Sequence, residues 1–171
     1  MGFEWADKYC RFDFLFKGDD DVFLNIPRLL DFVGDAEVPK ISLYAGNVHY
    51  AARVARKGRY GVPEHEYRKS IYPRYCSGGG FLLTSDVVKK FLSVIPDVGV
   101  IRIDDAYVGE LALRSSVDVY HDERFLNMAA GGGGCHPLSQ DSVVHHPVTS
   151  EVCMDLLYQQ TMFTIIANGK V

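Results

Sequence analysis

The sequence lacks several features that would place it in common protein classes. It contains no apolar run long enough to span a bilayer, and its first ten residues lack the apolar segment of a signal peptide. Lysine and arginine together number 18 and form no basic run, and the formal net charge is −4, so a nucleic-acid-binding surface is not favoured. The four cysteines form no C-x-x-C pair, and their even number is compatible with two disulfides or with reduced thiols.

The remaining composition is that of an ordinary globular domain. The chain has 171 residues, of which 47% are hydrophobic and 23% are charged, so it can enclose a core of its own. Apolar periodicity and turn residues predict strands that alternate with helices, which favours an α/β sheet over an all-β fold. The predicted strands cover residues 12–17, 41–44, 81–83 and 117–120; one helix ends near residue 10, and others begin near residues 25, 85, 104 and 150.

Three consecutive aspartates, Asp19, Asp20 and Asp21, follow the first predicted strand. Because side chains alternate along an extended chain, Asp19 and Asp21 are expected on one side and Asp20 on the other. Neighbouring carboxylates repel one another, and a hard cation such as Mg²⁺ or Mn²⁺ would compensate them. A solvated acidic turn is the alternative that this segment leaves open when it is taken alone.

A second acidic pair, Asp104 and Asp105, begins a predicted helix. One interpretation is a helix cap with a favourable interaction with the helix dipole. The other is a general base, because a carboxylate held beside an acceptor hydroxyl group can take its proton. The pair by itself is compatible with both.

A glycine-rich run extends from Cys76 to Gly80. Its backbone could approach a ligand closely, although it lacks the lysine and hydroxyl residue of a P-loop. A tight turn is the alternative interpretation.

Two histidines, His145 and His146, precede the last predicted helix and could cap that helix, lie on the surface or bind a metal ion. A zinc site can also be drawn from these histidines with Cys135, His136 and Cys153. The spacing of these residues matches no standard zinc pattern, so we do not favour it.

Four segments, taken in order, resemble the β-1,3-galactosyltransferase and β-1,3-N-acetylglucosaminyltransferase family, glycosyltransferase family 31. Residues 12–25 resemble the family's strand that ends in K-x-D-D-D-V-F-x-N, and residues 69–84 resemble its Y-P-P-Y-C-S-G-G-G block. Residues 102–109 resemble its E-D-V-Y-V-G block, and Val144-His145 resembles a late V-H element. Each segment alone is weakly specific, but four in the same order are strongly specific.

The resemblance implies a fold of the GT-A type and an inverting transfer of a hexose from a UDP-sugar to a glycan acceptor on a protein or lipid, with Mn²⁺ as cofactor. It implies Asp105 as the catalytic base, and Asp21 and His145 as metal ligands. The other residues that it places at the donor are Asp19, Asp20, Tyr75, Gly78 and Gly79. Galactose, N-acetylglucosamine and N-acetylgalactosamine stay open as the donor sugar.

The resemblance also implies a cellular setting. Family members are single-pass type II proteins whose catalytic domain faces the Golgi lumen behind a signal-anchor, and their fold has strands before the acidic triplet. We therefore expect residues 1–171 to be one partial catalytic domain with its first strands missing. The alternative is a catalytically inactive remnant that binds glycans or partner proteins.

Overall fold

A computed structural model describes residues 2–125, 135 and 141–167. The elements are α1 (Gly2–Tyr9), β1 (Phe14–Lys17), β2 (Phe23–Leu24), α2 (Ile26–Gly34), β3 (Tyr44–His49), β4 (Tyr75–Thr84), α3 (Ser85–Val94), α4 (Asp104–Arg114), β5 (Tyr120–His121), β6 (Val144–His145) and α5 (Glu151–Ala167). Short 3₁₀ helices cover Ile95–Asp97 and Glu123–Phe125.

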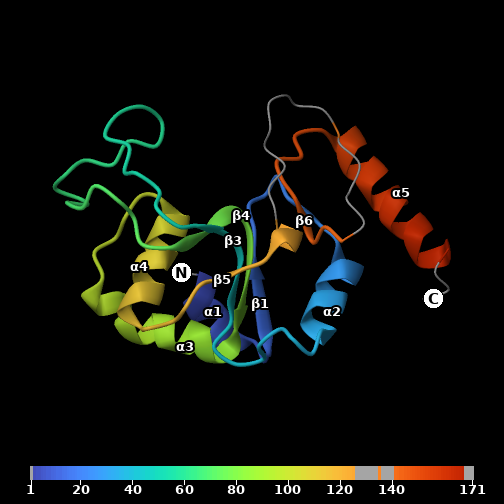
Figure 1. Ribbon diagram of the computed structural model, residues 1–171, viewed down its shortest axis with the longest axis horizontal. Coiled ribbons are helices and arrows are strands. Elements are labelled where there is room, and N and C mark those ends of the chain that lie inside the picture. The colour runs from blue at the N-terminus through green and yellow to red at the C-terminus, as the bar shows by residue number, and fades with distance from the viewer. Residues whose placement is uncertain (1, 126–134, 136–140, 168–171) are drawn as a thin grey trace.

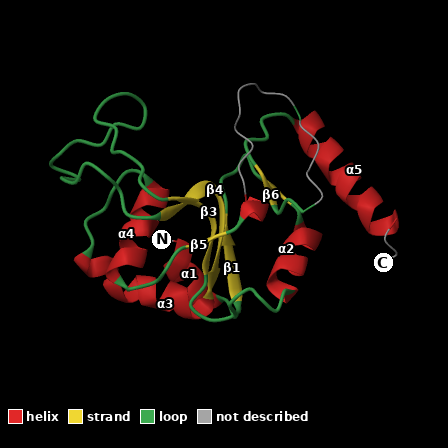
Figure 2. Ribbon diagram, in the orientation of Figure 1, coloured by secondary structure: helices red, strands yellow, loops and turns green. Residues whose placement is uncertain are grey.

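The main sheet has the order β1-β4-β3-β5. Strand β4 pairs antiparallel with both β1 and β3, whereas β3 pairs parallel with β5, so the sheet is mixed. Helices α1, α3 and α4 lie on one side of this sheet and α2 on the other (Figure 1; Figure 2). The α/β prediction is confirmed, and a mixed sheet flanked by helices is consistent with a GT-A type fold.

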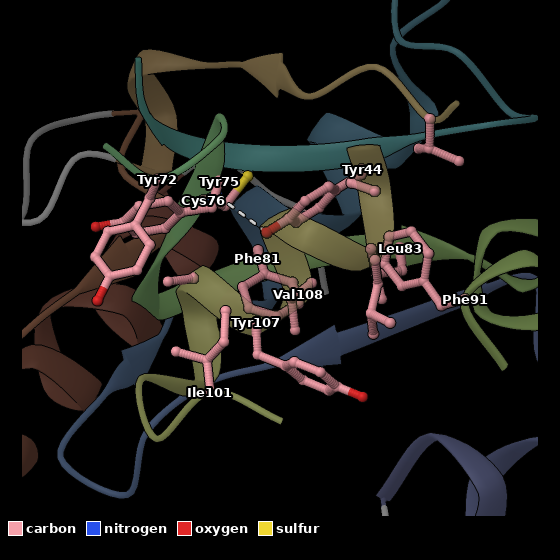
Figure 3. Close-up of a cluster of buried hydrophobic side chains, with 14 of the residues drawn as sticks. Tyr44, Tyr72, Tyr75, Cys76, Phe81, Leu83, Phe91, Ile101, Tyr107 and Val108 are labelled. Carbon is pink, nitrogen blue, oxygen red and sulfur yellow. Dashed lines mark hydrogen bonds between the residues drawn. The ribbon is translucent and has the colours of Figure 1, made fainter. Parts of the chain in front are cut away.

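Alternation along the central strands separates two cores. Phe81 and Leu83 of β4 point toward the side of α3 and α4, whereas Leu82 between them points toward α2. On the first side, the Tyr44 ring packs edge-on against Phe81, and its hydroxyl oxygen accepts a hydrogen bond of 3.0 Å from the backbone N–H of Cys76 (Figure 3). Because both faces of β4 are apolar, the strand is covered on both sides.

A second, two-stranded sheet pairs β2 antiparallel with β6. It brings the residues after β1 next to a segment more than 120 positions later in the chain (Figure 1). Helix α5 follows and packs on Phe23 and Val148 through Cys153 and Leu157. Cys153 forms a disulfide with Cys135, while Cys10 and Cys76 are free thiols.

Several element boundaries differ from those predicted from the sequence. Residues 81–83 were predicted as a short strand, but β4 begins already at Tyr75, because Tyr75 and Cys76 pair with His49 and Val48 of β3. Helix α2 begins as predicted, with the Asn25 side chain accepting a hydrogen bond from the N–H of Arg28. Among the described residues, no helix is long and apolar enough to cross a membrane.

Candidate active site

The acidic triplet forms the turn between β1 and β2. The carboxylates of Asp19 and Asp21 lie together with the imidazole of His146, and one ligand atom from each lies within 4.8 Å of the others. The Nε2 atom of His146 is 3.1 Å from Asp21 Oδ1 and 3.9 Å from Asp19 Oδ2. Asp20 is exposed and is not part of this group, as the alternation of side chains predicted. We call Asp19, Asp21 and His146 the acidic–histidine group.

The pairing of β2 with β6 brings the histidine to the triplet. Phe23 lies opposite His145 in this antiparallel register, so the next residue, His146, comes beside the turn that holds Asp21. A backbone hydrogen bond of 2.7 Å from the N–H of Val148 to the carbonyl of Asp21 fixes the two segments. His145 itself is buried on β6 and is not a member of the acidic–histidine group. The histidine beside the carboxylates is thus His146, whereas the sequence suggested His145 as the metal ligand.

The acidic–histidine group suits a divalent cation. Two carboxylate oxygens and one imidazole nitrogen are ligands that Mn²⁺ and similar ions accept. The buried Nδ1 atom of His146 has no hydrogen-bond partner among the described residues, and Nε2 is the ring nitrogen that faces the carboxylates. Within the described part of the chain, Asp19, Asp21 and His146 are therefore residues that fit such an ion.

Asp105 lies in the first turn of α4, and its carboxylate and that of Asp19 both lie beside Gly78 of β4. Its Oδ2 accepts a hydrogen bond of 3.1 Å from the N–H of Gly78, and its Oδ1 accepts one of 2.8 Å from the N–H of Ala106. Burial raises the pKa of Asp105, and the charge of Asp104 adds to this increase. The two hydrogen bonds and the charge of Lys17 act in the opposite direction, but the net pKa is above the ordinary value.

Gly78 is the point where the two acidic segments meet. A Cβ atom at this position would lie 3.3 Å from Asp19 Oδ2, 3.6 Å from Asp105 Oδ2 and 3.6 Å from Lys17 Nζ. Gly79 is buried beside it in β4, and its carbonyl oxygen approaches Gly18 at the start of the acidic turn. The absence of a side chain at Gly78 thus leaves room for both carboxylates.

Tyr75, at the start of β4, borders the same region. Its ring packs against that of His49 with 4.9 Å between centroids, and burial raises its pKa, with a further contribution from the charge of Asp105. Helix α4 comes close here because Gly109 has no side chain: a Cβ on Gly109 would lie 2.7 Å from the Cβ of Tyr75. This close packing places the first turn of α4 beside β4.

Lys17 is a site residue that the sequence-based argument did not single out. Its Nζ atom lies 2.9 Å from Asp19 Oδ1 and 2.9 Å from Asp104 Oδ2. Burial lowers the pKa of Lys17, but its hydrogen bonds to Asp104 and Asp19 outweigh burial and leave the pKa above its ordinary value. Its position two residues before Asp19 was the available signal, because residues i and i+2 of an extended chain share a side.

Two alternatives from the sequence can now be compared with the structure. The helix-cap interpretation of Asp104 and Asp105 is wrong for the cap itself, since Ile103 is the N-cap residue and both aspartates lie inside the first turn. The zinc alternative is not supported, because Cys135 and Cys153 are joined to each other in a disulfide. His136, its remaining member, lies outside the described residues.

Comparisons with known proteins identify a family of similar sequences. A family model described as Galactosyltransferase matches residues 1–123. UDP-GlcNAc:betaGal beta-1,3-N-acetylglucosaminyltransferase 7 of Rattus norvegicus is 38% identical over 109 residues, which are 62% of this chain and 27% of the rat protein. N-acetyllactosaminide beta-1,3-N-acetylglucosaminyltransferase 4 of Homo sapiens is 34% identical over 124 residues, which are 71% of this chain and 32% of the human protein.

The matches to these two curated relatives thus cover 27% and 32% of the relatives' own lengths. The family model covers more than half of the present chain and includes the acidic turn, the glycine-rich strand and the first turn of α4. This chain therefore belongs to the galactosyltransferase family, glycosyltransferase family 31.

Proposed function

We propose that this chain carries the metal-binding and catalytic part of an inverting β-1,3-glycosyltransferase that uses a UDP-sugar donor and a glycan acceptor. The observation that supports this most directly is that the carboxylates of Asp19 and Asp105 both lie beside Gly78, 3.3 Å and 3.6 Å from the position that a Cβ atom would take there. A donor site and an acceptor base must be neighbours if the acceptor oxygen is to attack the sugar. Membership of a glycosyltransferase family agrees with this chemistry.

In the proposed mechanism, Asp21, Asp19 and His146 would hold Mn²⁺, with His146 in the role that the sequence suggested for His145. The ion, when bound, would offset the negative charge that develops on the departing UDP. Asp20, Tyr75, Gly78 and Gly79 are proposed to line the donor. These residue roles follow from the family resemblance and from the positions described above.

Asp105 is proposed to accept the proton of the acceptor hydroxyl group. The N–H groups of Gly78 and Ala106 each bind one of its carboxylate oxygens, so its orientation is fixed before the acceptor arrives. The acceptor oxygen then bonds to the anomeric carbon as the bond to UDP breaks on the opposite face, and the proton passes to Asp105. An α-linked donor gives a β-linked product without a covalent enzyme intermediate.

We propose N-acetylglucosamine as the donor sugar, because the names of the relatives given above specify its transfer. We also propose that the full-length protein faces the Golgi lumen behind an N-terminal membrane anchor. The Cys135–Cys153 disulfide supports an oxidising compartment of this kind. The acceptor would be a glycan on a glycoprotein or a glycolipid.

The decisive experiment measures the melting temperature with Mn²⁺, with UDP and with both. We expect Mn²⁺ and UDP together to raise the melting temperature, and Asp21→Ala to remove this increase. The control is Asp97→Ala, which removes an exposed carboxylate and should keep the increase. Transfer is then measured with UDP-N-acetylglucosamine, UDP-galactose and UDP-N-acetylgalactosamine. An unmutated chain that shows neither the increase nor any product would instead favour an inactive remnant that binds glycans or partner proteins.

A further inference from the structure

Lys17 joins three segments of the candidate active site. Besides its contacts of 2.9 Å with Asp19 and with Asp104, its Nζ atom donates a hydrogen bond of 3.4 Å to the carbonyl of Gly78. The three acceptors come from the turn after β1, the first turn of α4 and strand β4. The ammonium also lies 5.7 Å from the centre of the Phe81 ring, opposite which Lys17 pairs in the sheet. We call Lys17, Asp19, Asp104 and Gly78 the lysine bridge.

The lysine bridge leaves the reactive atoms of both acidic segments available. Lys17 contacts Oδ1 of Asp19, whereas Oδ2 of that carboxylate is the atom nearer to His146. On the other segment, Lys17 contacts Asp104, whereas Asp105 is oriented by the backbone N–H groups of Gly78 and Ala106. A side chain that bonds the second oxygen of Asp19 and the neighbour of Asp105 can orient both carboxylates without blocking either.

The positive charge of Lys17 also offsets repulsion among the carboxylates of the site. Asp19, Asp21, Asp104 and Asp105 would repel one another and also a donor diphosphate that enters between them. Lys17 is half-buried, and its single positive charge is shared between one carboxylate of each acidic segment. The side chain of Asp104 at one end of the bridge is 73% exposed and that of Asp19 is 43% exposed, so each ion pair contributes little free energy by itself. The bridge therefore acts through its geometry, because one ammonium group contacts both acidic segments at once.

We propose that Lys17 is a positioning residue that sets the separation between the donor-metal carboxylates and the catalytic base. This inference rests on the proposed glycosyltransferase function. In such a site, Lys17 acts through Asp19 and Asp104 and does not need to touch the donor. Loss of either end of the bridge should then have the same consequence, because the two contacts form one connection.

A double-mutant cycle tests this proposal. We expect Lys17→Met and Asp104→Asn each to lower kcat for sugar transfer by about 10–100-fold, as is typical for residues that orient metal ligands. The double variant should be no worse than either single one, because the second change removes a contact that is already lost. Lys17→Arg should restore part of the activity, and Lys89→Met, which removes an exposed lysine of α3, should leave it unchanged.

Binding of Mn²⁺ with UDP, measured by calorimetry on the same variants, separates positioning from direct contact with the donor. Positioning predicts a larger change in kcat than in the dissociation constant of UDP. If the losses affect only donor binding, and the loss in the double variant equals the sum of those in the two single variants, Lys17 is a phosphate ligand and the proposal is overturned. Unchanged kcat in Lys17→Met would overturn it as well. If the unmutated chain neither binds Mn²⁺ with UDP nor transfers sugar, the proposed function fails. The same double-mutant cycle is then measured by melting temperature. Additive changes in melting temperature would show that the two contacts of Lys17 do not form one connection, and would overturn the proposal.

Discussion

At the scale of single residues, Asp105 combines burial with two backbone hydrogen bonds. Burial raises the pKa of its carboxyl group above the ordinary 3.8. A general base must be ionised to accept a proton, so transfer activity should fall as the pH decreases through this raised pKa. The fall therefore begins at a higher pH than an ordinary, exposed carboxyl group would give.

The pH dependence of kcat/KM measures this effect. We expect an acidic limb in the unmutated enzyme, and we expect Asp105→Asn to lower kcat by about 10²–10⁴-fold, the usual contribution of a general base. The dissociation constant of UDP with Mn²⁺ should change little. An acidic limb that persists unchanged in the residual activity of Asp105→Asn would assign the titration to another group.

The two adjacent histidines provide a second residue-scale prediction. His146 Nε2 faces Asp21, whereas His145 is buried on β6 outside the acidic–histidine group. His146→Gln should abolish most of the increase in melting temperature that Mn²⁺ and UDP produce, and His145→Gln should keep that increase even though its own melting temperature is lower. The reverse result would return the ligand role to His145.

At the scale of elements, two glycines of β4 have different surroundings. A Cβ on Gly80 would lie 2.9 Å from both Phe16 Cζ and Val144 Cγ2, which are core side chains, whereas one on Gly78 would meet charged groups of the site. Gly80→Ala should therefore reduce the free energy of unfolding by about 1–3 kcal/mol, the usual cost of overpacking. Gly78→Ala should instead weaken Mn²⁺ and UDP binding.

Urea unfolding and calorimetry on the two alanine variants distinguish these effects. Each variant serves as the control for the other, since both place one methyl group in the same strand. If Gly78→Ala and Gly80→Ala lost the same stability and bound Mn²⁺ and UDP equally well, the two glycines would not differ in role as proposed.

Boundaries of elements were predictable where a local signal exists. Helix α2 begins at the Asn25 cap, because a capping residue marks that position in the sequence. Helix α3 begins at Ser85, as its helical period indicates, although its N-cap residue is Thr84, whose side chain makes no cap hydrogen bond. The full length of β4 was not predicted, because its glycines carry little strand propensity. Its first half is a strand because it pairs with β3, which is a tertiary contact.

At the scale of the whole molecule, α5 is attached through few contacts. Its buried residues are Cys153, Leu157 and Thr161, and the disulfide from Cys153 to Cys135 closes a segment of 18 residues. Cys135→Ser should lower the free energy of unfolding of the whole chain by about 2–4 kcal/mol. Alternatively, it should lower by a similar amount the free energy needed to detach α5 while the rest of the chain stays folded. Amide hydrogen exchange of residues 151–167 with urea unfolding measures both outcomes.

The matched control is Cys10→Ser, because Cys10 is an exposed free thiol. It should leave both the unfolding midpoint and the exchange of α5 unchanged. Identical behaviour of the two serine variants would show that the disulfide does not hold α5 in place.

The sequence by itself determined the α/β class, the family and the two acidic segments, because periodicity, caps and motif order are local properties of the chain. It also predicted that Asp19 and Asp21 lie together, and in the structure the turn after β1 brings their carboxylates together with His146. The tertiary structure decided which histidine faces Asp21, since the register between β2 and β6 joins residues far apart in sequence. It likewise decided the contact of Lys17 with Asp104, because this contact depends on how β1 and α4 pack. The pairing of Cys135 with Cys153 is also a tertiary contact, because Cys153 lies in α5 and Cys135 lies 18 positions earlier in the chain.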